Sequence, residues 1–173
     1  MKKIISLVVV MSFVNLSFSA KAGKNISVDD INYYSENCYQ QTVLLEQKVS
    51  PEDLSTFSCI QVLQSNWLSN EREAITRLNR GLIYLYQGQL ENALIDFKKA
   101  VSAKPTLYQG HLALGKLYFS QKQFTQSIIH FDLALTINND DPKVIRKRAL
   151  ALLLHNKNQT LLLSKNERNG EYN

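Results

Sequence analysis

The sequence repeats itself at an interval of 34 residues, and this period restricts the fold more than any other feature. Residues of matching size and chemistry pair at this one offset: Gly81 with Gly115, Tyr84 with Tyr118, Leu85 with Phe119, Leu90 with Phe124, Phe97 with Phe131 and Ala100 with Ala134. A fixed period of roughly 20–50 residues is typical of small structural units that stack and bury their apolar faces against one another. The chain is therefore predicted to form a short repeat array.

The apolar spacing predicts two helices in each copy of the repeat. These helices are expected over 73–87, 90–103, 107–121 and 124–137. Gly88 suits the left-handed end of the first helix. Gly81 and Ala100 are small residues on facing helices, and they let the backbones approach while the ring of Phe97 fills the remaining space. Larger side chains at the small positions would push the helices apart, at a cost of about 1–3 kcal/mol.

The spacing of these landmarks resembles that of the tetratricopeptide repeat (TPR) family. The resemblance is carried by Gly81-x2-Tyr84…Ala93-x3-Phe97…Pro105 and by Gly115-x2-Tyr118…Ser127-x3-Phe131. It covers residues 74–139. The sequence departs from the family pattern at a few positions: Arg77 and His111 where the family often has Trp, Arg80 where it has Leu, and Asn139 where it has Pro.

The resemblance implies an all-α fold in which antiparallel helix pairs stack as a short right-handed solenoid. The TPR domain is expected over 70–155, with repeats at about 74–107 and 108–141. The stretch "LNRG" at 78–81 also resembles short exported bacterial members of this superfamily. Two repeats leave an apolar face at each end, so the flanking segments are expected to cover those ends.

The C-terminal end of the stack is predicted to be covered by one more helix. Asp141 is a favourable N-cap residue and Pro142 a favourable first helical residue. We interpret residues 142–155 as the first helix of a third, unfinished repeat that acts as a cap. Residues 156–173 are expected to form a polar, frayed tail, in which the leucines at 161–163 are the one stretch able to dock.

The N-terminal end is predicted to be covered by a helical hairpin over 23–69. Ser27 is placed to cap a helix over 28–47, and Ser50 is placed to open a second helix over 51–64, with Pro and acidic residues in its first turn. Such a hairpin would fold back over the first repeat and bury its exposed face.

Cys38 and Cys59 are equidistant in sequence from the turn of this hairpin, so they are expected to lie opposite each other on its two helices. A disulfide needs this arrangement, with Cα atoms about 4.4–6.8 Å apart. Closing the loop between them would stabilise the fold by about 3 kcal/mol. The alternative is a pair of free, buried cysteines.

The first 22 residues have the pattern of a secretory signal peptide. Lys2 and Lys3 precede an apolar run of 15 residues, and Ala20-Lys21-Ala22 offers a cleavage site after Ala22. Export to a bacterial periplasm is expected, with no stable membrane insertion after cleavage. The alternative is an uncleaved anchor, which requires about 20 apolar residues. Cleavage removes three lysines and no acid, so the formal net charge falls from +5 to +2. No basic block supports a nucleic-acid partner.

The sequence offers no catalytic or metal-binding motif. His111, His130 and His155 have no metal-like spacing, and His111 falls where the repeat packs its helices, so a buried or half-buried packing role is expected. No Gly-rich phosphate loop, HExxH or GxSxG motif occurs. We therefore predict no enzyme activity, cofactor or metal. Trp67 is expected to pack between the hairpin and the repeats and to fill the space there.

The resemblance also implies a partner-binding groove, because the first helices of successive repeats line a concave surface in the family. By position this groove would present Leu78, Leu82, Leu85, Tyr86, Leu112, Lys116, Phe119 and Arg146, together with Ile75, Gln109, Ser120, Lys143 and Leu150. In the family, a lysine and an asparagine on the first of these helices bind the terminal carboxylate of a peptide. Leu78 and Leu82 stand at those positions here, so this mode of binding is not expected. Lys116 and Arg146 are candidate anion contacts. The alternative is that the N-terminal hairpin fills the groove.

These features predict a non-catalytic periplasmic adaptor or scaffold that binds an unidentified protein or peptide in the concave groove. The alternative is a structural component of the cell envelope that self-associates through the ends of the solenoid. The residues favour neither a monomer nor an oligomer.

Overall fold

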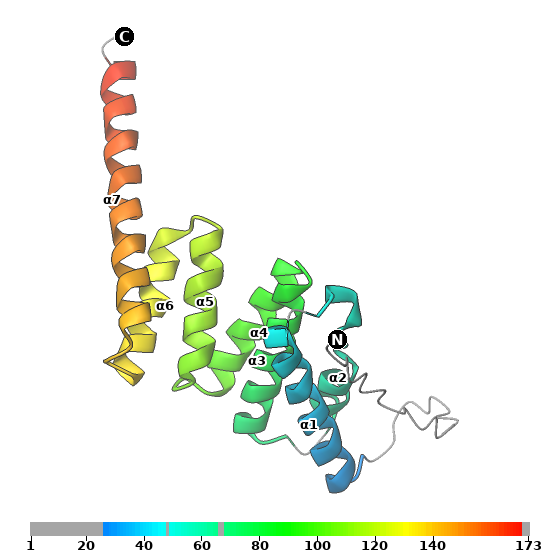
Figure 1. Cartoon of the computed structure of the whole chain (residues 1–173). Coiled ribbons are helices and arrows are strands. Elements are labelled where there is room, and N and C mark those ends of the chain that lie inside the picture. Colours follow the sequence, from blue (N-terminus) through cyan, green and yellow to red (C-terminus); the bar gives the residue numbers. More distant parts are fainter. Residues whose placement is uncertain (1–25, 48, 66–67, 171–173) are drawn as a thin grey trace, which may run out of the picture.

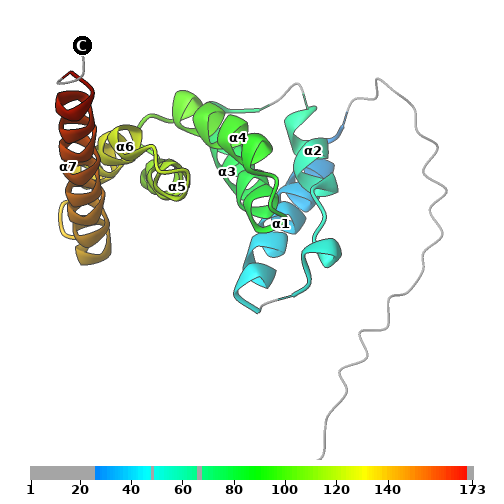
Figure 2. The same cartoon turned by 90° about the horizontal axis from the view of Figure 1, so that it is seen from above.

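The computed structural model describes residues 26–47, 49–65 and 68–170, with side chains as far as Lys165, and over these residues it contains helices and no strand. The helices in chain order are α1 (Val28–Leu44), the 3₁₀ helices η1 (Leu45–Gln47) and η2 (Pro51–Asp53), α2 (Phe57–Leu63), α3 (Asn70–Tyr86), α4 (Leu90–Ala103), α5 (Tyr108–Ser120), α6 (Phe124–Ile137) and α7 (Pro142–Gly170). Figure 1 and Figure 2 show the α1–α2 hairpin at one end of the stack and α7 at the other. The predicted signal peptide, residues 1–22, and Trp67 lie outside the described residues.

The two predicted repeats form the helix pairs α3–α4 and α5–α6. In these four helices, every predicted boundary lies within three residues of the observed one. A Cβ atom at Gly81 would lie 2.6 Å from Cε1 of Phe97, and one at Gly115 would lie 2.6 Å from the ring of Phe131. Gly88 ends the turn after α3 with φ of +75°. The predicted role of the small residues, close approach of a ring to the facing backbone, is confirmed.

One apolar core joins the two repeats. Phe97 and Ala100 of α4 lie in a single cluster with Leu114 and Leu117 of α5, and all four are fully buried. Burying a leucine or phenylalanine side chain contributes about 1.5–3 kcal/mol. Because α4 packs against both α3 and α5, the pairs form a continuous helical solenoid.

The N-terminal hairpin contains the predicted disulfide. Cys38 of α1 and Cys59 of α2 are bonded, with their Cα atoms 4.9 Å apart. Ser27 and Asp30 form a capping box at the start of α1, as the expected N-cap requires. The two half-cystines share a buried cluster with Ile83 of α3. The disulfide therefore lies directly beneath the surface on which the first repeat packs.

The second helix of this hairpin is shorter than predicted. Instead of one helix over 51–64, residues 54–56 separate η2 from α2. Leu54 is extended, with φ −88° and ψ 136°, and its side chain is buried in the cluster around the disulfide. Nε2 of Gln87 donates to the carbonyl oxygens of Pro51 and Leu54, each at 3.1 Å. These tertiary contacts override the local helix signal.

α7 is longer than predicted. It begins at Pro142, where Oδ1 of Asp141 accepts from the backbone N–H of Lys143 at 2.8 Å, as the predicted cap requires. It continues to Gly170 instead of ending near 155, so the segment predicted to be a frayed tail is helical to that residue. The reason is that no Pro or Gly interrupts 143–169. None of the described helices, α7 included, has the length and apolar character to cross a membrane.

Candidate functional site

Three of the leucines predicted to floor the groove belong to the core of the stack. Leu78, Leu82 and Leu85 of α3 pack in the cluster that contains Leu114 and Leu117 of α5. Leu78 is buried and the other two are partly buried. The cluster through which the N-terminal hairpin contacts α3 contains none of these three leucines. The leucines therefore pack within the repeats, and binding of a partner by them stays a prediction.

Tyr86, Leu112 and Phe119 also have partners within the chain. The Tyr86 hydroxyl donates to the carbonyl oxygen of Val49 at 2.8 Å, which ties the end of α3 to the hairpin. Leu112 packs against the buried cluster between α6 and α7. The ring of Phe119 meets that of Phe124 edge-on, with centroids 5.6 Å apart. Lys116 and Arg146, the two residues predicted as anion contacts, are exposed.

Lys116 of α5 lies beside two lysines of α7. Desolvation and the positive charges of Lys147 and Lys143 lower the pKa of Lys116, while the negative charge of Asp141 opposes them. We call Lys116, Lys143 and Lys147 the lysine cluster. Among the residues with described side chains, no carboxylate forms an ion pair with any of the three. The cluster is therefore a basic surface without a direct ion pair among these residues, and Asp141 offsets part of its charge.

Asp141, the acid that faces the lysine cluster, is already engaged. Its Oδ2 accepts from the Tyr108 hydroxyl, and its Oδ1 accepts from the backbone N–H groups of Lys143 at 2.8 Å and Val144 at 3.3 Å. The Tyr108 hydrogen bond, followed by that from Lys143, lowers the pKa of Asp141. Desolvation and the same contact raise the pKa of Tyr108 to about 12. Asp141 thus serves as the cap of α7 and leaves the lysine cluster available to an external anion.

The sequence prediction identifies part of this cluster. It places Lys116 and Lys143 in the groove, but it has Arg146 as the second anion contact and omits Lys147. The charges that shift the pKa of Lys116 come from Lys147 and Lys143. These two lysines are four residues apart and share one helix face. That spacing is the signal that would have identified Lys147.

A buried charge network and a histidine pair occupy equivalent places in the two repeats. Asp96 accepts hydrogen bonds from Arg80 at 2.7 and 2.8 Å and lies 3.6 Å from Arg77. One repeat later, His111 and His130 stand where Arg77 and Asp96 stand. His111 is buried, as its predicted packing role requires. Both pairs join the two helices of their own repeat, so they belong to the fold rather than to a binding surface.

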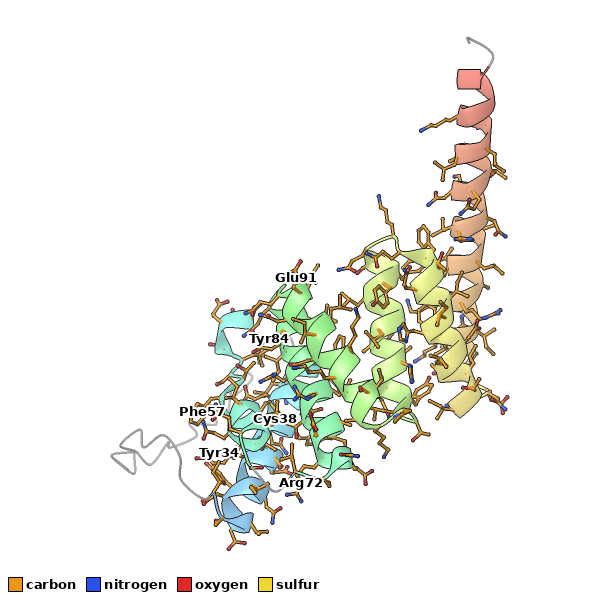
Figure 3. All side chains as sticks on the ribbon, turned by 180° about the vertical axis from the view of Figure 1, so that it is seen from behind. Tyr34, Cys38, Phe57, Arg72, Tyr84 and Glu91 are labelled. Carbon is orange, nitrogen blue, oxygen red and sulfur yellow. A yellow bond between two sulfur atoms is a disulfide. The ribbon has the colours of Figure 1, made fainter. Side chains whose placement is uncertain are left out.

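A surface pocket of about 350 Å³ lies between α1 and the start of α3. Its lining is mixed: Ser35 and Tyr39 come from α1, and Arg72, Ile75 and Asn79 are among those from α3. Figure 3 shows Arg72 at the start of α3, beside the hairpin that carries Tyr34, Cys38 and Phe57. Within the described part of the chain, no group of three or more His, Cys, Asp or Glu is placed to hold a metal ion.

Comparison with known proteins identifies the repeats. Residues 81–122 match the family described as TPR repeat, and residues 108–141 match the family described as tetratricopeptide repeat. Tetratricopeptide repeat protein 6 of Homo sapiens is 30% identical to this chain over 83 residues, which are 48% of this chain and 16% of that protein. The chain therefore spans a small part of that relative's length.

Proposed function

Because this chain is a tetratricopeptide repeat protein, we propose that it is a non-catalytic adaptor that binds an acidic segment of another protein on the lysine cluster. TPR arrays mediate protein–protein interaction, and this supports the general role. The observation that carries the specific proposal is that Lys143 and Lys147 of α7 lie close enough to Lys116 of α5 to lower its pKa, while the nearby Asp141 is already hydrogen-bonded. Carboxylates of a partner would form charge-assisted hydrogen bonds with these lysines.

Apolar side chains adjoin the lysine cluster and define the rest of the partner segment. Leu150 lies three residues after Lys147, on the same side of α7, and is 46% exposed. A segment that alternates acidic and apolar residues would neutralise the lysines and cover this leucine. Acidic-motif recognition by a basic cluster is an established way for a helical scaffold to bind a peptide.

The adaptor is proposed to work outside the cytoplasm, in a bacterial periplasm. The support is the charged start, the short apolar run and the Ala20-Lys21-Ala22 site, together with a disulfide, which persists in oxidising compartments. Mass spectrometry of the protein recovered from a periplasmic fraction tests this. A chain that starts at Gly23 is expected, and recovery in the cytoplasm with Met1 retained contradicts it.

Fluorescence anisotropy with a labelled peptide of alternating Glu and Leu tests the binding proposal. The double variant Lys116→Glu, Lys147→Glu is expected to weaken binding at least about tenfold, and added salt is expected to weaken binding to the unaltered protein. The matched control Lys99→Glu, Lys165→Glu makes the same change in net charge at exposed lysines outside the cluster. Equal weakening by both double variants would show non-specific attraction and overturn the proposal.

A further inference from the structure

In both complete repeats the first helix packs against the second through equivalent positions. In the second repeat, His111 contacts His130, Gly115 contacts Phe131, Tyr118 stacks on His130 and Phe119 meets Phe124. In the first repeat, Arg77 contacts Asp96 and Gly81 contacts Phe97 in the same way. These positions therefore lie on the side of the first helix that packs against the second helix of the same repeat.

On α7 the same positions are exposed. Thirty-four residues after His111, Gly115, Tyr118 and Phe119 stand Ile145, Ala149, Leu152 and Leu153. Ile145 is 46% exposed, Leu152 40% and Leu153 64%, and Ala149 is exposed as well. We call these four residues the open face of α7. It presents apolar side chains where the two complete repeats bury theirs, and no described helix covers it.

The open face continues along the projecting half of α7. The helix has 29 residues, against 14 in α6, and Figure 1 shows it extending beyond the helix pairs. Leu163 lies 18 residues after Ile145, which is five full turns, so the two share one side of the helix. Leu163 is 61% exposed. The surface is long enough for a partner helix of at least the length of α6.

The charges of α7 identify the kind of helix that fits. Residues 142–165 contain no Asp or Glu, and their basic residues are Lys143, Arg146, Lys147, Arg148, Lys157 and Lys165. A second copy of α7 placed on the open face would bring like charges together, which is unfavourable. A helix with acidic flanks would neutralise them. Ala149 stands where Gly81 and Gly115 lie against a phenylalanine ring, and its Cβ would collide with a ring placed in the same way, so the incoming helix is expected to carry a leucine opposite it.

We propose that α7 acts as the first helix of a repeat whose second helix, absent from the described residues, is supplied by another protein, as an acidic amphipathic helix that packs a leucine against Ala149. This inference goes beyond the adaptor function proposed above, because it uses a different side of α7 from the lysine cluster.

The test uses a peptide derived from α6, the helix that fills this place in the second repeat. It copies residues 123–138 and carries the changes Gln126→Glu, Ile129→Glu, Leu133→Glu, His130→Leu and Phe131→Leu. The first three make its exposed positions acidic, and the last two place leucines opposite Ile145 and Ala149. A second peptide, which carries Phe131→Ala instead of Phe131→Leu, is the matched control. Binding to the purified full chain is measured by fluorescence anisotropy.

Saturable binding is expected for the first peptide, with at least about tenfold weaker binding for the control peptide and for the protein variant Leu152→Glu. The protein variant Leu161→Glu, which changes an exposed leucine on another side of α7, is expected to bind normally. Lys116→Glu is also expected to bind normally, which separates this result from a failure of the lysine cluster. Absence of binding, or equal binding by the Leu152→Glu variant, overturns the proposal. So does a dimer in analytical ultracentrifugation that this variant dissociates, because a second copy would then occupy the open face.

Discussion

The Nδ1 atoms of His111 and His130 lie 3.3 Å apart, at the positions that Arg77 and Asp96 occupy one repeat earlier. Nε2 of His111 lies 2.9 Å from the carbonyl oxygen of Pro105, which can only accept, so this nitrogen carries the proton and donates. Nδ1 of His111 is then an acceptor, and Nδ1 of His130 donates to it. The contact between α5 and α6 is therefore a hydrogen bond from Nδ1 of His130 to Nδ1 of His111.

Acid is expected to weaken the second repeat through His130. Desolvation, His111 and Lys98 lower the pKa of His130 from 6.5 to about 4. The unfolded chain takes up this proton near pH 6.5 and the folded chain only near pH 4, so stability is lost as the pH falls between these values. We expect the free energy of unfolding in urea to fall by about 1–2 kcal/mol between pH 7 and pH 4.5 from this residue. The variant His130→Leu should lose this part of the pH dependence of the free energy of unfolding, and His155→Gln should retain it. An unchanged pH dependence in both variants contradicts the assignment to His130.

The buried carboxylate of Asp96 is expected to matter far more than an exposed one. Asp96 is 1% exposed and is held by Arg80, whose pKa is raised chiefly by this hydrogen bond. Asp96→Ala leaves a partly buried guanidinium without its partner, so a loss of about 3 kcal/mol is expected in urea unfolding. The matched change Asp132→Ala removes the partly exposed pair with Arg148 and should cost less than about 1 kcal/mol. Equal losses would show that burial of the ion pair is not the cause.

The contact between Gly81 and Phe97 is expected to tolerate no added methyl group. Gly81→Ala places a Cβ 2.6 Å from the ring, so a loss of about 1–3 kcal/mol is expected in urea unfolding. Ser102→Ala, an exposed helical change in α4, is the control and should have a small effect. Replacing the ring by Phe97→Leu should remove the clash, so Gly81→Ala should lower the free energy of unfolding less in the double variant than on its own. Strictly additive losses would refute direct contact.

Reduction of the disulfide is expected to loosen the hairpin before the repeats. Cys38 and Cys59 lie in the buried cluster that joins the hairpin to Ile83. The double change Cys38→Ser, Cys59→Ser should lower the free energy of unfolding by about 3 kcal/mol. Hydrogen exchange should rise first in α1 and α2, while α5 and α6 stay protected. A uniform rise over all helices would show that the hairpin and the repeats unfold as one unit.

The repeat core is predictable because its signals are local and recur. Gly81 and Phe97 belong to a pattern that appears twice at one offset, and each helix shows apolar residues on one face. The disulfide follows from the symmetry of Cys38 and Cys59 about a predicted turn. Arg80, which departs from the family pattern, is explained by its bond to Asp96, sixteen residues away on the facing helix.

The remaining features depend on tertiary contacts or on weak local signals. Leu54 breaks a predicted helix because its side chain completes the cluster around the disulfide, which no local pattern indicates. The second half of α7 has the polar composition of a tail, although nothing in 156–169 stops a helix. Lys147 is absent from the predicted groove because its role depends on its position near Lys116, which belongs to another helix.

A nuclear magnetic resonance titration tests the proposed adaptor function most directly. The isotope-labelled protein is titrated with the peptide of alternating Glu and Leu. We predict that the largest, saturable chemical-shift changes fall on Lys116, Lys143 and Lys147 and on the backbone of α5 and α7 around them. The absence of saturable changes, or changes centred on the pocket lined by Arg72 between α1 and α3, would contradict the proposed adaptor function.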